Sequence, residues 1–320
     1  MKLKMMYSFL NNDLQIIENE LEATIQTERA LLQEASLHLL QAGGKRIRPV
    51  FVLLAAKLGT YDIHKVKNVA VALELMHMAS LVHDDVIDDA ELRRGKATIK
   101  AKWDNRIAMY TGDYIFARSL EMMTKVEDIE AHRILSNTLV ELCKGEIEQI
   151  RDKYNYDQNL RTYLRRIKRK TAILIAVSCQ LGAITSGVPA SVHQSLYWFG
   201  YYVGMSFQIT DDILDFTSTE EQLGKPAGSD LLQGNITLPV LYAMESPVLN
   251  EKIRTIHEHS DSKEIKEIID LIKGSDAIDR SFALSDRYLN KAFKELENLP
   301  NGVAKRTFNN VAKYIGKRKY

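Results

Sequence analysis

The sequence predicts an all-α protein, which we expect to form one domain over residues 1–320. Apolar residues recur at spacings of three and four along nearly the whole chain, and no run alternates apolar and polar residues for long enough to predict a strand. Only 6 prolines occur, which suits an all-helical chain. Because each amphipathic helix must bury its apolar face, we expect the helices to share one core.

Local signals justify the helices in order. Asn12 or Asp13 would cap the first helix, and Gly43-Gly44 would end the second. Pro49 suits the opening of the third helix, and Asp62 can cap a long fourth one. Together with the apolar spacing, these signals predict helices at about residues 14–25, 28–41, 50–58, 62–89, 100–125, 129–154 and 160–185.

Breaks between the later helices are marked by glycine, proline and polar residues. Arg93-Arg94-Gly95 should end the fourth helix, and we expect an interruption of the fifth near Thr111-Gly112. Pro189 begins a long helix that runs to a polar loop at 217–230. We expect shorter helices from that loop to the C-terminus.

Composition narrows the class of protein. Hydrophobic residues make up 45% of the chain and charged residues 27%, as in an ordinary soluble globular protein. The formal net charge is +1, so no overall field would attract nucleic acid or an anionic membrane. We therefore expect no nucleic-acid partner.

Targeting and redox signals favour the cytoplasm. Residues 1–7 lack the long apolar core of a signal peptide, and the longest apolar run, 172–185, is too short to span a membrane. Cys143 and Cys179 lie in apolar helical contexts, where we expect buried thiols in a reducing compartment, although the sequence leaves a disulfide open. The chain should therefore be cytoplasmic, without a transmembrane segment.

Two acidic motifs are the strongest functional signal. Both have the pattern Asp-Asp-x-x-Asp within an apolar helical run, and they comprise Asp84, Asp85 and Asp88, then Asp211, Asp212 and Asp215. The first and last aspartates of each motif share a helix face. A solvated acidic face is the alternative, but unpaired charge in apolar surroundings is costly. Such carboxylates suit Mg²⁺, which takes further ligands from water and phosphate, so the motifs would hold a diphosphate.

Basic residues near the first motif are candidate diphosphate ligands. Lys45 and Arg48 follow two glycines at a helix N-terminus, which suits an anion, although surface cations after a glycine cap would look the same. Arg93 and Arg94 follow the motif and could grip diphosphate oxygens or merely balance its charge. His77 lies two turns before the motif on the same face, where a satisfied core histidine is the alternative.

Further candidates surround the second motif. Lys170 ends a basic segment, 161–170, most of which is expected to be a solvated helix face, and it lies where solvent meets the core. Gln208 precedes the motif by three residues and shares its face. Lys225, on the loop that follows the motif, could fold over a bound phosphate.

These residues, in this order, resemble the trans-isoprenyl diphosphate synthase family over essentially the whole chain. The resemblance rests on Gly-Gly-Lys-Arg-x-Arg-Pro at 43–49, the stretch 77–95, Lys170-Thr171, the stretch 208–215 and Gly-Lys-Pro at 224–226. It implies the isoprenoid synthase fold, with antiparallel helices around a central cavity. It also implies Mg²⁺-dependent condensation of isopentenyl diphosphate onto an allylic diphosphate such as farnesyl diphosphate.

The resemblance assigns residue roles by position. It implies Mg²⁺ at Asp84, Asp88, Asp211 and Asp215, with Asp85 and Asp212 in the same catalytic motifs. The allylic diphosphate would contact Arg93, Lys170, Thr171, Gln208 and Lys225, and isopentenyl diphosphate would contact Lys45, Arg48, His77 and Arg94. Ala79, Ser80 and Met76 would set product length. Many relatives carry lysine where this chain has Asn235, so one phosphate contact is in doubt.

Residues 37–46 and 314–320 resemble most closely a two-component, long-chain branch of the family, which supplies the seven-unit side chain of menaquinone. That resemblance implies a heterodimer with a small regulatory subunit, component I. Three alternatives stay open: a self-sufficient homodimeric synthase of another chain length, a class I terpene cyclase, and a non-catalytic subunit. A cyclase needs no isopentenyl diphosphate motif, and a non-catalytic subunit needs no intact acidic motifs.

Overall fold

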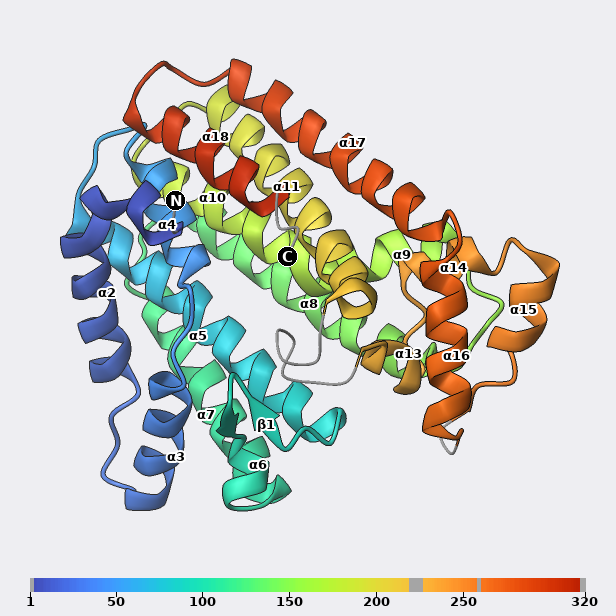
Figure 1. Ribbon diagram of the computed structural model, residues 1–320. Helices are drawn as coiled ribbons and strands as arrows, with labels where there is room; N and C mark the ends of the chain where they lie inside the picture. Colours follow the sequence, from blue (N-terminus) through green and yellow to red (C-terminus); the bar gives the residue numbers. More distant parts are fainter. Residues whose placement is uncertain (1–2, 219–226, 258–259, 317–320) are drawn as a thin grey trace. The chain divides into compact units, whose positions relative to one another are not determined.

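The computed structural model describes residues 3–218, 227–257 and 260–316, and these form helices connected by short loops (Figure 1). The prediction of an all-α fold is confirmed. The helices are α1 (Leu3–Met6), α2 (Asn11–Thr24), α3 (Ala30–Gln41), α4 (Ile47–Ala56), α5 (Ile63–Ile87), α6 (Ile99–Lys102), α7 (Asn105–Met123), α8 (Ile129–Arg151), α9 (Leu160–Ile167), α10 (Ile173–Thr185), α11 (Ala190–Thr217), α13 (Ser229–Leu232), α14 (Leu238–Ala243), α15 (Pro247–Ile253), α16 (Ser262–Lys273), α17 (Ala277–Glu297) and α18 (Val303–Gly316).

Three further elements refine the helical pattern. A 3-10 turn, η1 (Ser8–Leu10), leads into α2, and a π-helical turn, η2 (Lys168–Ala172), joins α9 to α10. Strands β1 (Leu92–Arg93) and β2 (Lys96–Ala97) form a small antiparallel hairpin after α5. The sequence predicted no strand there, because two-residue strands are too short to show alternation.

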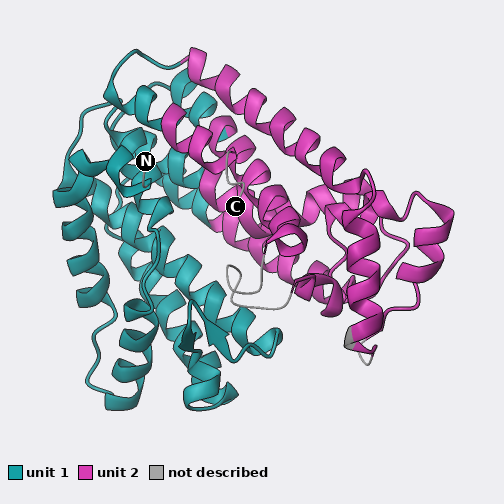
Figure 2. Ribbon diagram, in the orientation of Figure 1, with its two compact units in different colours: residues 1–135, 177–197, 299–308 teal, residues 136–176, 198–298, 309–320 magenta. Residues whose placement is uncertain are grey.

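The chain divides into two compact units, which are described separately (Figure 2). Unit 1 comprises residues 1–135, 177–197 and 299–308, and unit 2 comprises residues 136–176, 198–298 and 309–320. That the whole chain forms one domain remains a prediction. Within the described ranges, no helix combines the length and apolar character needed to cross a membrane.

Unit 1 is built around α5, which packs against α7, α4 and α2. Apolar residues follow one another on α5 with little polar interruption, so most of the helix is buried, including Leu73, Met76 and Ala79. Asp62 caps it as predicted, with its side chain accepting a hydrogen bond from the His64 backbone N–H. The capped, buried helix holds the first acidic motif rigidly at its C-terminal end.

Unit 2 contains two apolar clusters. In one, Tyr163, Ala172 and Ile209 join α9, η2 and α11 in a fully buried core. In the other, Phe216 at the end of α11 packs among residues of the helices that follow, such as Ile253 and Ile269. Ile209 and Phe216 lie on either side of the second acidic motif in α11, so the motif sits between two residues that are anchored in buried clusters.

Some predicted helix ends are wrong. The first helix begins at Asn11 directly after η1, so its cap is Leu10, and Asn12 and Asp13 lie inside the helix. The break predicted at Thr111-Gly112 falls instead at Asp104, whose side chain accepts from the Ile107 N–H and starts α7.

Two other predictions are also corrected. A Cβ on Gly112 would collide with the ring of His83 on α5. This glycine therefore lets α7 pack closely against α5, and it does not break α7. Among the helices expected to be short near the C-terminus, α17 extends over 21 residues. Of the two cysteines, Cys179 is buried as predicted but Cys143 is exposed, and neither forms a disulfide.

Candidate active site

The first acidic motif occupies the C-terminal end of α5, where its three aspartates have different surroundings. Asp85 is only 3% exposed, accepts a hydrogen bond from Arg93 Nε at 2.7 Å, and forms an ion pair with Arg93 Nη2 at 2.6 Å. Burial, together with repulsion from Asp84 and Asp88, raises the pKa of Asp85, although Arg93 opposes the shift. Asp84 and Asp88 are half-buried. Asp85 is therefore held by Arg93, and Asp84 and Asp88 are the more accessible carboxylates of the motif.

The hairpin after α5 returns the chain towards the loop that precedes α4. Arg94 and Gly95, between its strands, both have positive φ angles, of 54° and 77°. A Cβ on Gly44 would lie 2.8 Å from Arg94 Nη1, so the glycine makes room for the Arg94 guanidinium. Arg94 is thereby brought against the Gly43–Pro49 segment.

Arg46 fixes the conformation of that loop. It precedes α4 in the left-handed region, at φ 49°, which is uncommon for a residue other than glycine. Its guanidinium spans two carboxylates, with Nε 2.5 Å from Glu18 Oε1 and Nη1 3.1 Å from Glu74 Oε1. These two ion pairs hold the loop onto α2 and α5.

Arg46, Arg48, His77 and Arg94 form a group that we call the cation cradle. Burial and repulsion from Arg94 lower the pKa of Arg48 to about 10, despite the attraction of Glu74. Burial first, and then the positive charges of the neighbouring arginines, lower the pKa of His77 well below 6.5. His77 is therefore a neutral imidazole among cations, which suits an anionic ligand. Lys45 is exposed on the same loop.

Hydrogen-bonding capacity in the cradle is not fully used. Nε of Arg48 and Oε2 of Glu74 are both buried, and no group in the described part of the chain lies within hydrogen-bonding distance of either atom. Leaving such groups without partners is costly, and functional sites are a common reason for it.

The second acidic motif lies in unit 2, on α11, and its aspartates also differ. Asp212 is buried and accepts hydrogen bonds from Tyr163 Oη at 2.7 Å and Gln208 Nε2 at 2.8 Å. Thr171 Oγ1 donates to Gln208 Oε1 at 2.6 Å, so a chain of hydrogen bonds runs from the π-helical turn to the motif. Burial, reinforced by repulsion from Asp230, raises the pKa of Asp212 to about 7.

Asp215 connects the motif to the next helix. Its side chain is 2% exposed, and its two oxygens accept from Ser229 Oγ and from the Asp230 backbone N–H, each at 3.1 Å. These contacts cap the first turn of α13. Asp211 is half-buried, which makes it the more accessible of the two predicted metal ligands in this motif.

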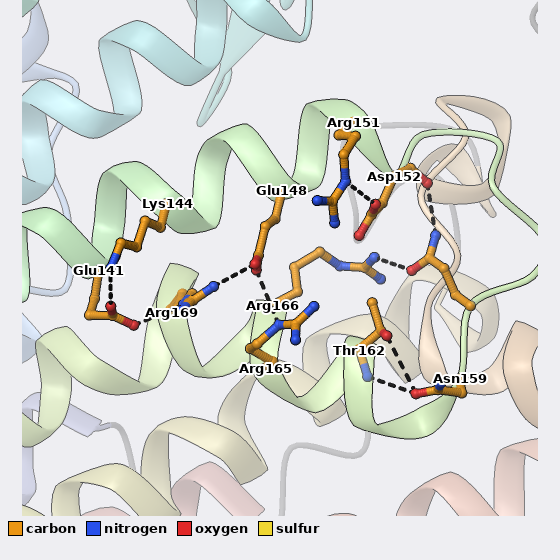
Figure 3. A network of polar contacts seen from close by, with 11 residues as sticks. Glu141, Lys144, Glu148, Arg151, Asp152, Asn159, Thr162, Arg165, Arg166 and Arg169 are labelled. Carbon is orange, nitrogen blue, oxygen red and sulfur yellow. Dashed lines mark hydrogen bonds and ion pairs between the residues drawn. The ribbon is translucent and has the colours of Figure 1, made fainter.

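The π-helical turn η2 carries Lys170 and Thr171 and is braced by ion pairs to α8 (Figure 3). Arg169 contacts Glu148 at 2.6 Å and Glu141 at 2.8 Å. Lys170 Nζ donates to Gln149 Oε1 at 3.0 Å and lies 3.8 Å from Glu146 Oε2. π-turns inside α-helices are rare overall, but those that occur are often found at functional sites.

The remaining predicted residues are placed as follows. Met76 and Ala79 are buried in α5, at 1% and 0% exposure. Ser80 is half-buried, and its hydroxyl donates to the His77 carbonyl at 2.9 Å. Lys225 lies outside the described residues. Among the predicted ligands of unit 1, Arg48, His77 and Arg94 are thus brought together, whereas Arg93 is engaged by Asp85.

The donor set suits Mg²⁺ only in combination with a substrate. Within the described residues, no three side chains of His, Cys, Asp or Glu lie close enough to hold a metal ion by themselves. Each motif instead offers hard carboxylate oxygens, which is what Mg²⁺ takes when phosphate and water complete its octahedral shell. The residues therefore fit a metal that arrives with a diphosphate.

Sequence reasoning missed Glu74, Arg46 and Tyr163. All three act through another residue, and their partners are far away in the sequence, as in the pairing of Tyr163 with Asp212. A signal for Glu74 was nevertheless present. It is a lone carboxylate inside an apolar helical run, one turn before His77, where an unpaired charge would be costly.

Two sequence comparisons with known proteins both indicate a polyprenyl synthase. The family model described as polyprenyl synthetase matches residues 29–272, which is more than half of the chain. Heptaprenyl diphosphate synthase component 2 of Bacillus subtilis (strain 168) is 67% identical over 320 residues, covering 100% of this chain and 92% of that protein. These two findings concern sequence alone.

Solved structures give the same result for the fold. The crystal structure of heptaprenyl diphosphate synthase from Staphylococcus aureus matches with a TM-score of 0.93 and 47% identity, covering 97% of this chain and 98% of that one. A polyprenyl synthase from Caulobacter crescentus, complexed with calcium and isoprenyl diphosphate, matches with a TM-score of 0.94 and 30% identity, covering 100% and 98%.

Proposed function

This chain belongs to the polyprenyl synthetase family, and on that premise we propose that it is the catalytic subunit of a two-component heptaprenyl diphosphate synthase. It condenses isopentenyl diphosphate repeatedly onto an allylic diphosphate such as farnesyl diphosphate. The seven-unit product supplies the side chain of menaquinone, and the reaction takes place in the cytoplasm.

The cation cradle is the observation that carries this proposal. A terpene cyclase ionises one diphosphate and needs no second diphosphate site. In this chain Arg48, Arg94 and the neutral His77 are close enough to influence one another's charge, and none of them belongs to either acidic motif. A second anion site is what a condensation of two diphosphates requires, and the cradle supports assigning it to isopentenyl diphosphate, with Lys45 at its edge.

The allylic diphosphate is assigned to the acidic motifs. Asp84, Asp88, Asp211 and Asp215 would hold Mg²⁺, which when bound neutralises the charge that develops on the departing diphosphate. Asp85 and Asp212 keep the motifs in place through Arg93 and Tyr163. Lys170, Thr171, Gln208 and Lys225 would orient the same diphosphate, with Thr171 and Gln208 already linked.

The reaction then follows from the arrangement of the two substrates. The allylic carbon–oxygen bond breaks, the double bond of isopentenyl diphosphate attacks the resulting allylic cation, and a carbon–carbon bond forms. A proton is lost to restore a double bond, and we assign its acceptance to the departing pyrophosphate. One pyrophosphate and one proton are released for every unit added.

A partner subunit is expected for physical reasons. A seven-unit isoprenoid chain is wholly apolar, and each buried CH₂ is worth about 0.8 kcal/mol. The growing chain must therefore be shielded from water over its full length. A smaller helical subunit, component I, would supply or close the walls of the product channel that begins beside Met76, Ala79 and Ser80.

A product assay tests the proposal. The purified chain is incubated with farnesyl diphosphate, labelled isopentenyl diphosphate and Mg²⁺, with and without the smaller subunit, and products are separated by length. We expect seven-unit product from the mixture and little long-chain product from the chain alone. Full activity of the chain alone would indicate a self-sufficient homodimer, and a cyclic hydrocarbon without label would indicate a cyclase.

Asp84→Ala is the matched inactive variant for this assay. Losing one of two neighbouring carboxylates removes a metal ligand but also relieves like-charge repulsion on the helix, so the variant should stay folded. We expect it to be inactive with an unchanged circular dichroism spectrum. Near-normal turnover at saturating Mg²⁺ would remove Asp84 from the metal site.

A further inference from the structure

Glu74 is a buried carboxylate beneath the cation cradle. It is 3% exposed and lies one turn before His77 on α5. Its Oε1 accepts from Arg46 Nη1 at 3.1 Å, while its Oε2 is buried with no hydrogen-bond donor from the described residues within reach. Isolated buried carboxylates are costly, so this one must be compensated by charges around it.

Those charges are the arginines of the cradle. The negative charge of Glu74 acts on Arg46, Arg48 and Arg94 alike and favours the charged form of each guanidinium. Arg94 is repelled by Arg46, and Arg48 is repelled by Arg94. Glu74 is therefore a negative charge shared by three cations, although Arg46 also pairs with Glu18.

Two readings of this carboxylate make opposite predictions. If Glu74 only neutralises charge, removing it leaves the cradle more positive and a diphosphate binds more tightly. If Glu74 sets geometry, removing it takes away one of the two ion pairs that hold Arg46 and lets the cradle spread, so a diphosphate binds less tightly. The direct 3.1 Å contact to Arg46, in a loop whose φ of 49° must be enforced from outside, favours geometry.

We propose that Glu74 is a positioning residue for isopentenyl diphosphate: through Arg46 it fixes the Gly43–Pro49 loop, and it holds Arg48 and Arg94 at the separation that a diphosphate requires. The proposal rests on the assignment of the cradle to isopentenyl diphosphate. Glu74 itself does not touch the substrate, because it lies beneath the arginines and is buried.

Steady-state kinetics with two variants provide the main test. Glu74→Gln keeps size and one contact to Arg46 but loses the charge, whereas Glu74→Asp keeps the charge but shortens the reach. We expect both to raise the Michaelis constant for isopentenyl diphosphate by about ten- to a hundredfold, the range for losing a charge-assisted contact. The Michaelis constant for the allylic substrate should change by less than about twofold.

A control and a cycle separate positioning from general damage. Glu20 pairs with Lys67 at 2.7 Å in the same unit, so Glu20→Gln should leave both Michaelis constants unchanged. In a double-mutant cycle of Glu74→Gln with Arg46→Lys, the two effects should be strongly non-additive, because Glu74 acts through Arg46. Circular dichroism confirms that each variant is folded.

The outcomes decide between the readings. A lowered or unchanged Michaelis constant for isopentenyl diphosphate in Glu74→Gln overturns the proposal, as does wild-type behaviour of Glu74→Asp. Additive effects in the cycle also overturn it. A second measurement does not depend on turnover: the rise in melting temperature caused by inorganic pyrophosphate should be smaller in both variants than in the wild type. If the wild type makes no product but this difference persists, the proposed function fails while the role of Glu74 stands.

Discussion

Ala79 is fully buried in α5, five residues before the first acidic motif, and it is one of the small residues assigned to the product channel. We expect Ala79→Phe to shorten the products, because the ring would block the channel assigned to the growing chain. The extra volume should also destabilise the fold by about 1–3 kcal/mol. Products are compared by chain length in the presence of the partner subunit.

Ala70→Phe is the matched control for this substitution. Ala70 is equally buried in α5, but nine residues earlier and therefore on the opposite side of the helix. Ala70→Phe should lower the free energy of unfolding about as much as Ala79→Phe does, without changing product length. An unchanged product profile from folded Ala79→Phe would refute the assignment of Ala79 to the channel floor.

His77 gives a prediction for pH dependence. Its pKa in the folded chain is well below 6.5, so between these values the unfolded chain binds a proton that the folded chain does not. Stability from this residue is therefore present above about pH 6.5 and is lost as the pH falls towards the folded pKa. The wild type should lose more melting temperature than His77→Gln between about pH 7.5 and 5.5.

Differential scanning calorimetry measures this difference, and His64 on the same helix supplies the control. His64 is exposed, so His64→Gln should lose as much as the wild type over that range. Equal losses in the wild type and His77→Gln would show that burial and the surrounding arginines do not depress the pKa of His77 in the folded chain.

Several candidate site residues could be identified from the sequence, whereas the side-chain pairs that they form could not. The aspartate motifs, the cradle cations and Lys170 stand out because a charged side chain within or beside an apolar helical run is costly unless it is paired or binds a ligand. Arg93 stands out equally, but the sequence does not show that it pairs with Asp85, at 2.6 Å. Pairing of that kind depends on the hairpin that turns Arg93 back onto α5, and a two-residue strand leaves no periodic trace.

At the scale of elements, long helices were predicted well because apolar periodicity extends over many turns. The helix expected over 62–89 is α5, and the one expected over 160–185 is present from end to end. The π-turn inside the second of these was not predicted. One extra residue per turn changes the periodicity too briefly to be seen, and the ion pairs between this turn and α8 leave no periodic pattern either.

The brace between α8 and the π-turn leads to a prediction about Gly145. A Cβ on this residue would lie 2.7 Å from Arg169 Cβ, so Gly145→Ala must displace the turn that carries Lys170 and Thr171. Alanine favours the helix by about 1 kcal/mol, but overpacking costs about 1–3 kcal/mol. We expect a severalfold rise in the Michaelis constant for the allylic substrate and no change for isopentenyl diphosphate.

Gly302→Ala controls for the change in glycine content, because no atom lies within 4 Å of the Cβ it would add. It should leave both Michaelis constants at their wild-type values. Unaltered allylic kinetics in Gly145→Ala would mean that α8 does not determine the position of Lys170 and Thr171.

At the scale of the whole molecule, the expectation of one domain can be tested by its unfolding. Helices α8, α10, α11 and α18 each contribute residues to both compact units, so neither unit can lose its structure without disrupting helices of the other. Calorimetry should therefore give a single endotherm whose van't Hoff and calorimetric enthalpies agree. Two resolved transitions would contradict a single domain over residues 1–320.

The two cysteines differ in burial, so a thiol reagent should label one of them selectively in the folded chain. Burial raises the pKa of the Cys179 thiol above its ordinary value, which suppresses the reactive thiolate, whereas Cys143 is exposed on α8. A maleimide dye should therefore attach once to the native protein and twice after denaturation, as mass spectrometry would show. The wild-type chain would then carry one fluorophore, at Cys143 on α8, the helix whose carboxylates pair with the π-turn. The emission of this fluorophore could be followed during substrate binding.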